Sequence, residues 1–238
     1  MSRHIFFNRH GGVSRGCFKS LNIAGSVGDR RDHVKENFRI IKARSGIKAL
    51  ITAHQVHGDK VGVISSDPAS DRCVGDVDAL ITNRPGLGLT VQLADCQGVL
   101  LYDPLNSAVA AIHCGWRGSV IGIIDKTVKK MNAVFGSDPA DLQAFVSPSL
   151  GPCCAEFKHY KTELPADFHS FQVEPYYFDF WEISRYQLTG AGLAHNNIEI
   201  AGICTSCSND YFSYRRACRN GDGRTGRHCA VISLQPTL

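Results

Sequence analysis

Short apolar runs separated by turn residues dominate the pattern of hydrophobic and polar positions along the chain. The runs are rich in Val, Ile, Leu and Thr and are bounded by Pro or Gly, which is typical of β-strands. They lie at residues 49–53, 60–64, 78–82, 87–93, 98–102, 108–113, 198–203 and 230–234. Several runs follow one another without a helical pattern between them, which favours mixed sheets over a regular βαβ alternation.

Three other segments repeat their apolar residues at helical spacing. The first follows Asp32, which we expect to be the N-cap, and Gly46 predicts its end. The other two span residues 119–135 and about 179–191. We therefore expect the α/β fold class, of the α+β type, with a single layered domain over residues 1–238 in which helices flank mixed β-sheets.

Composition and charge indicate an ordinary folded protein rather than a membrane protein or a nucleic-acid-binding protein. The chain has 238 residues, of which 43% are hydrophobic and 20% charged, as in ordinary folded proteins. Its net charge of +4 comes from scattered basic residues without a long run of like charge, so neither nucleic acid nor a membrane is an expected partner. The N-terminus resembles no signal peptide, and no apolar run suits a membrane helix. We expect a soluble, cytoplasmic protein; the oligomeric state stays open.

Ten cysteines occur in the chain, and a protein of this size without a signal peptide favours reduced thiols over disulfides. We expect most to be small buried side chains and one or two to bind metal. The Pro152-Cys153-Cys154 segment lacks the spacing of a zinc deaminase site. Cys204 and Cys207 have the spacing of a redox or zinc pair, but no second such pair accompanies them, which favours simple burial.

The strongest chemical signal lies between residues 94 and 118. Residues 103–107 read as a turn, so the flanking strands predict a hairpin whose facing positions sum to about 209 or 210. That register places Cys96 opposite His113. His57, or His54 in its place, offers a third ligand just after a predicted strand. One Cys and two His ligands leave a position open, which is typical of catalytic zinc; a Cys–His hydrolase is the alternative use of Cys96 and His113.

Four arginines in glycine-rich or turn-rich sequence are candidates for phosphate binding, because guanidinium groups match phosphate oxygens. They are Arg117, Arg215, Arg216 and Arg227. Asp95 precedes Cys96 and would point away from it on a strand, so we expect it to hold the turn.

Several motifs, in the order in which they occur, resemble one known family. They are His10-Gly11-Gly12-Val13-Ser14, Ser20-Leu21-Asn22, Val27-Gly28-Asp29, Gln55-Val56-His57-Gly58, Ala94-Asp95-Cys96, His113-Cys114-Gly115-Trp116-Arg117-Gly118, Gly151-Pro152-Cys153-Cys154, Phe212-Ser213-Tyr214-Arg215-Arg216 and Thr225-Gly226-Arg227. Over nearly the whole chain this set resembles the YfiH-like, laccase-domain family of purine nucleoside phosphorylases, also labelled polyphenol oxidoreductases.

The resemblance implies a metal site and an activity. His57, Cys96 and His113 would be the metal ligands and catalytic residues, with Zn²⁺ favoured over copper, and Arg117 the leading candidate for holding phosphate. The partners would be a purine nucleoside and phosphate, in the phosphorolysis of adenosine- or inosine-type nucleosides and the deamination of adenosine. The alternatives are a zinc amidohydrolase that edits cell-wall precursors, a copper-dependent polyphenol oxidoreductase and a non-enzymatic metal-stabilised binding module.

Departures from the family pattern bear on the metal. His54 stands where the family usually has asparagine, Gln97-Gly98 replaces an apolar-Pro pair, and Cys114 replaces a small residue. His54 and Cys114 could therefore add a ligand. A multicopper oxidase is disfavoured, since the ten histidines contain a single close pair and no His-x-His.

Overall fold

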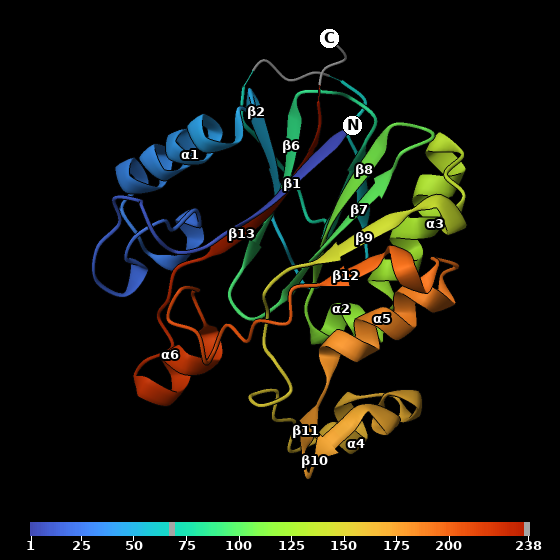
Figure 1. Cartoon of the computed structure of the whole chain (residues 1–238). Coiled ribbons are helices and arrows are strands. Elements are labelled where there is room, and N and C mark those ends of the chain that lie inside the picture. Colours follow the sequence, from blue (N-terminus) through green and yellow to red (C-terminus); the bar gives the residue numbers. More distant parts are fainter. Residues whose placement is uncertain (67–69, 236–238) are drawn as a thin grey trace.

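The computed structural model describes residues 1–66 and 70–235, which build two mixed β-sheets packed face to face (Figure 1). The five-stranded sheet has the order β1 (Ser2–Phe7), β13 (His228–Leu234), β6 (Leu87–Leu93), β2 (Ala49–Ala53), β4 (Arg72–Val74). The six-stranded sheet has the order β12 (Ile198–Ile200), β9 (Gln143–Val146), β7 (Gln97–Asp103), β8 (Ala108–Cys114), β5 (Ala79–Thr82), β3 (Val61–Val63). Both contain parallel and antiparallel pairs, which confirms the predicted α/β class with mixed sheets.

Helices cover the outer faces of the two sheets, giving an α/β/β/α arrangement. Helix α1 (Arg31–Ser45) lies against the five-stranded sheet, and α3 (Ile123–Phe135) and α5 (Phe180–Gly190) lie against the six-stranded sheet (Figure 1). Shorter elements gather at the lower end of the view. They include α2 (Trp116–Val120), α4 (Tyr160–Glu163), α6 (Tyr214–Asn220) and the hairpin of β10 (Gln172–Glu174) and β11 (Tyr177–Phe178). The 3-10 helices are Gly16–Phe18, Gly25–Val27, Pro139–Asp141, Ala166–Phe171 and His195–Asn197.

Strand β8 serves two cores, because its side chains alternate between the faces of a sheet that is buried on both sides. Ile112 and Cys114 belong to the core beneath α3 and α5. Val109 and Ala111 belong to the core between the two sheets. The strand is therefore apolar at nearly every position, and its single histidine, His113, lies on the side of the sheet that faces the other sheet.

The hairpin of β7 and β8 is present, but its predicted register is wrong. Asp103 pairs with Ala108 and Gly98 with His113, so that Cys96 precedes the paired region. The turn contains four residues between the paired positions, and the Asp103 carboxylate accepts the backbone N–H groups of Leu105 and Asn106 at 2.9 Å. The predicted register therefore fails because the Asp103 side chain stabilises a longer turn.

Two helix boundaries also differ from expectation. The segment 119–135 forms two helices, since Gly122 adopts a left-handed φ of 74° between α2 and α3. Asp32 lies in the first turn of α1, whose N-cap is Arg30, while Gly46 ends the helix as predicted. Strand β12 ends at Ile200, three residues before its predicted end.

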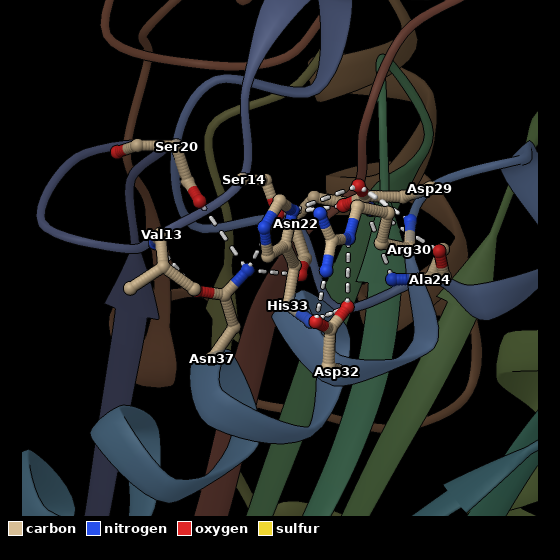
Figure 2. Close-up of polar contacts among 10 residues, drawn as sticks. All are labelled: Val13, Ser14, Ser20, Asn22, Ala24, Asp29, Arg30, Asp32, His33 and Asn37. Atoms are coloured by element: carbon tan, nitrogen blue, oxygen red, sulfur yellow. Dashed lines mark hydrogen bonds and ion pairs between the residues drawn. The ribbon is translucent and has the colours of Figure 1, made fainter.

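A buried polar network fixes the loop that precedes α1, and it accounts for the first three motifs of the sequence (Figure 2). The Asn37 side chain on α1 accepts the Val13 N–H at 2.9 Å and donates to Ser14 Oγ at 2.9 Å and to the Asn22 carbonyl at 2.6 Å. Asp29 accepts from Ser14 Oγ and from Asn22 Nδ2. Because buried polar groups are costly when unpaired, this network holds the loop in one conformation.

Within residues 1–66 and 70–235, no helix is both long and apolar enough to cross a membrane.

Candidate functional site

Three side chains from separate segments meet at one end of the sheet sandwich. His57 follows β2, Cys96 lies between β6 and β7, and His113 is on β8. One donor atom of each lies within 4.8 Å of those of the other two, and Cys96 Sγ is 4.0 Å from His57 Nε2. The structure thus brings together the three residues that the sequence predicted as ligands. Cys96 and His113 are not a cross-strand pair, however, because Cys96 lies before the paired part of β7.

A buried carboxylate that the sequence analysis missed organises this cluster. Asp78 Oδ1 lies 2.8 Å from His113 Nδ1, which leaves Nε2 as the free nitrogen of that ring. The same carboxylate accepts the backbone N–H groups of Val56, His57 and Gly58 at 3.1, 2.9 and 2.7 Å. These bonds hold His57 at a left-handed φ of 59°, which is unfavourable for a residue with a Cβ. Only the pairing of β5 with β8 reveals the role of Asp78.

The charges of the cluster favour a thiolate. Burial raises the pKa of Cys96, but the positive charge of His113 and the hydrogen bonds from His113 and His57 outweigh it and lower that pKa to about 6. Burial conversely lowers the pKa of His113, while Cys96 and Asp78 outweigh it and raise that pKa to about 9. The thiolate is the form of cysteine that binds metal.

Close approach and an unusual backbone bring Cys96 into place. A Cβ at Gly115 would lie 3.0 Å from Cys96 Sγ and 3.2 Å from His57 Cδ2, so a larger residue would displace them. Asp95 has a φ of 90° and its carboxylate accepts Thr205 Oγ1 at 2.7 Å and the Arg215 N–H at 2.6 Å. Asp95 therefore holds the turn, as expected.

Neither additional candidate ligand reaches the cluster. His54 is exposed and its Nδ1 lies 2.7 Å from Asp76 Oδ1. Cys114 points to the opposite face of β8, where it contacts Ser119 Oγ at 3.2 Å and burial raises its pKa to about 12. Neither His54 nor Cys114 therefore provides a fourth ligand beside His57, Cys96 and His113.

A cavity of about 460 Å³ opens beside His57 and Cys96. Its lining combines aromatic and cationic side chains, namely Trp116, Phe157, Phe180, Tyr214, Arg117, Lys158 and Arg215. The Arg117 guanidinium lies over the Trp116 ring, 5.2 Å from its centroid. Aromatic faces can stack on a planar base, and the guanidinium groups can bind phosphate oxygens.

A second cavity, of about 620 Å³, borders the same three residues. His113 and Arg227 contribute to its wall. His57 and Cys96 line both cavities, so the cluster can be approached from two directions.

The arginines proposed for phosphate binding have different environments. Arg117 and Arg215 line the first cavity. Arg216 instead donates to the carbonyl oxygens of Thr205 and Ser208 at 2.6 and 2.8 Å, and also to those of Ser206 and Tyr211. These backbone partners occupy its guanidinium, so Arg216 organises a loop. The Arg227 guanidinium likewise donates to the Thr225 and Gly226 carbonyl oxygens.

Across residues 1–66 and 70–235, one other group of His, Cys, Asp and Glu side chains is compact enough to hold a metal ion. It consists of Cys153, Cys154, Cys204 and Cys207, and contains no histidine. The sequence pattern does not relate these two cysteine pairs to each other, and the predicted burial of the second pair is wrong, since Cys204 is half-buried and Cys207 is exposed.

Comparison with known proteins gives concordant matches. The model of a family described as multi-copper polyphenol oxidoreductase laccase matches residues 3–235. A Streptomyces coelicolor protein named purine nucleoside phosphorylase is 35% identical over 239 residues, covering 96% of this chain and 94% of that protein. A Bacteroides thetaiotaomicron protein of the same name is 33% identical over 232 residues, covering 90% and 86%.

The fold agrees with these matches. The crystal structure of the Bacillus licheniformis hypothetical protein YfiH has a TM-score of 0.90 and 31% identity, covering 98% of this chain and 93% of that one. The chain therefore belongs to the YfiH-like, laccase-domain family.

Proposed function

We propose that the protein is a zinc-dependent purine nucleoside enzyme that catalyses phosphorolysis of adenosine- or inosine-type nucleosides and deamination of adenosine. The observation that carries this proposal is that one cavity joins the His57–Cys96–His113 cluster to Arg117, Arg215 and an aromatic wall. The names of the Streptomyces and Bacteroides relatives support a purine nucleoside and phosphate as substrates.

The donor set suits zinc. One thiolate and two imidazoles are ligands of Zn²⁺ in sites with a fourth position for water or substrate. The Asp78 carboxylate on His113 Nδ1 is the kind of outer contact that orients a ligating imidazole. When bound, zinc supplies a Lewis acid that polarises substrate and lowers the pKa of water to roughly 7.

In phosphorolysis, the residues of the cavity position the two substrates. Aromatic side chains such as Trp116 and Phe157 stack on the purine, and Arg117 with Arg215 holds phosphate beside the sugar. A phosphate oxygen forms a bond to the anomeric carbon while the bond to the purine nitrogen breaks. The purine leaves with the bonding electron pair and takes a proton from the phosphate monoanion, so His57 and His113 need not act as free acids.

Deamination uses the same cavity with water as the nucleophile. Water adds at the amino-bearing ring carbon of adenosine, ammonia leaves, and inosine forms. The position of the base relative to Cys96 then decides which bond is attacked. All ten cysteines are free thiols, and free thiols persist in a reducing compartment. This supports a cytoplasmic location for the proposed enzyme.

Product analysis tests the proposal. Zinc-loaded protein incubated with adenosine should give adenine and ribose-1-phosphate when phosphate is present, and inosine when it is absent. Cys96→Ser should lose both products, whereas Cys17→Ser, which changes an exposed thiol outside both cavities, should keep them. Absence of both products at every zinc loading contradicts the proposal. Sustained oxygen consumption by copper-loaded protein with a phenol would instead support an oxidase.

A further inference from the structure

Four cysteines that are distant in sequence meet at the ends of two neighbouring strands. Strands β9 and β12 pair in parallel, with Ile198 beside Ala144 and Ile200 beside Val146. Parallel neighbours end at the same edge of a sheet, so the chain segments that follow them run on together. One segment carries Cys153 and Cys154, and the other carries Cys204 and Cys207.

Backbone contacts fix the two segments against each other. Ser149 forms an isolated parallel bridge with Cys204, and the Thr205 N–H donates to the Ser149 carbonyl at 2.9 Å. A Cβ at Gly151 would lie 2.9 Å from Cys204 Cβ, which shows how closely the segments approach. The Cys154 N–H donates to the Gly151 carbonyl at 2.9 Å, so a tight turn presents the first two thiols.

The sulfur positions match those of a tetrahedral metal site. All four Sγ atoms lie within 4.8 Å of one another, and Cys207 Sγ is 3.6 Å from both Cys153 Sγ and Cys154 Sγ. Zinc–sulfur bonds of about 2.3 Å in a tetrahedron place the sulfurs about 3.8 Å apart. Small side-chain adjustments therefore suffice to bring four thiolates around one ion, and all four cysteines are free.

The surroundings can balance the charge of such a site. Four thiolates around one divalent ion carry a net charge of about −2. Arg219 Nη1 lies 3.7 Å from Cys154 Sγ and provides a nearby positive charge. The Arg216 guanidinium holds the carbonyl groups of Thr205 and Ser206, inside the Cys204–Cys207 turn.

We propose that Cys153, Cys154, Cys204 and Cys207 bind a second zinc ion in a closed, structural tetrathiolate site. Each thiol releases its proton to solvent when it ligates, and no oxidation step is involved. The ion would join two chain segments that continue into walls of the first cavity, one at Glu156 and the other at Arg215. Glu156 and Arg215 in these walls are already joined by a bond from Arg215 Nη2 to the Glu156 carbonyl at 3.2 Å.

Metal content separates this site from the His57–Cys96–His113 cluster. Reduced protein equilibrated with zinc and freed of excess should retain about two zinc ions per chain. Cys96→Ser should retain about one, and so should the double variant Cys153→Ser with Cys207→Ser, which alters two exposed side chains. Cys17→Ser should retain both. A wild-type content of one ion that Cys96→Ser abolishes overturns the proposal.

Cobalt spectroscopy identifies the ligands independently of activity. Charge-transfer absorption from thiolate to cobalt should fall about five-fold in the Cys153, Cys207 double variant, because one of about five cobalt–thiolate bonds remains. It should fall by only about one fifth in Cys96→Ser. Equal losses in the two variants contradict a tetrathiolate site.

Thiol protection provides a readout on unmodified protein. Cys153 and Cys207 are exposed, as are Cys17 and Cys73. With zinc bound, N-ethylmaleimide should modify Cys17 and Cys73 but not Cys153 and Cys207, and a chelator should raise the modification rate of the last two at least ten-fold. Equal rates with and without zinc, or a disulfide among these four cysteines in zinc-supplied reduced protein, overturn the proposal.

Discussion

Asp78 contacts His113 twice: its Oδ1 lies 2.8 Å from the ring Nδ1, and its carbonyl oxygen accepts the His113 backbone N–H at 2.7 Å. The same carboxylate accepts the N–H groups of His57 and Gly58. One buried side chain therefore orients the ring of one candidate ligand and fixes the backbone of another.

We predict that Asp78→Asn weakens zinc binding without removing any candidate ligand. An amide accepts fewer hydrogen bonds and leaves His113 less well oriented, so affinity for one zinc equivalent should fall about 10- to 100-fold in a chelator competition. Asp76→Asn is the matched control, because Asp76 also binds a histidine, His54, but both are exposed and outside the cluster. Equal affinities in the two variants would contradict this role.

A second pair of variants, at His57 and His54, tests which of these two histidines is the third ligand beside Cys96 and His113. His57→Ala should lose the zinc equivalent that depends on Cys96, because it removes a donor atom from the compact cluster. His54→Ala should keep it, since the His54 ring is engaged by Asp76. Elemental analysis after dialysis measures both. The opposite pattern would assign the ligand to His54.

Arg117 and Arg216 should differ in the property that they affect. Arg117→Ala removes an exposed cation from the cavity, so the KM for phosphate should rise about ten-fold or more while the fold persists. Arg216→Ala leaves several backbone carbonyl groups without their charged partner and should lower the free energy of unfolding by about 2–3 kcal/mol. Phosphate kinetics and urea unfolding separate the effects; identical profiles would contradict the distinction.

His228 should make stability depend on pH. Neither ring nitrogen has a hydrogen-bond partner in the described part of the chain. Burial, followed by the charges of Arg227, Arg9 and Arg216, lowers its pKa from 6.5 to about 3. Below pH 6.5 the unfolded chain binds a proton that the folded chain does not, so the stabilising contribution is complete above that pH and declines towards pH 3.

The decline should be about 1.4 kcal/mol per pH unit across the middle of this range. His228→Gln removes the titrating group, and the difference between its urea-unfolding curves and those of the parent protein isolates that slope from the other carboxyl and histidine groups. Parallel pH profiles of the two proteins would show that His228 does not titrate on unfolding.

The sequence predicted those parts of the fold and site that depend on local pattern. The runs at 87–93 and 108–113 carry apolar residues at nearly every position, and both are strands. The candidate ligands were found from residue type and motif, because His57 and Cys96 lie in short segments next to such strands.

Contacts between residues that are distant in sequence could not be predicted from the local sequence pattern. Asp78 directly precedes strand β5, where a polar residue is common, and its role follows from the pairing of β5 with β8. Cys153 and Cys207 are 54 residues apart, and their meeting depends on the parallel pairing of β9 and β12. Because such pairings require the assembled sheet, no spacing rule within one segment reveals them.

The alternation of side chains along β8 links the chemistry of the site to a distant turn. His113 faces the candidate metal ligands and Cys114 faces the aliphatic core, so a shift of the strand by one residue would exchange them. The imidazole would then be buried beside Ile123, and a thiol would stand where the imidazole had been. The Asp103 carboxylate fixes the length of the turn through its hydrogen bonds to Leu105 and Asn106. It thereby determines whether this strand presents a nitrogen or a sulfur atom to a metal ion.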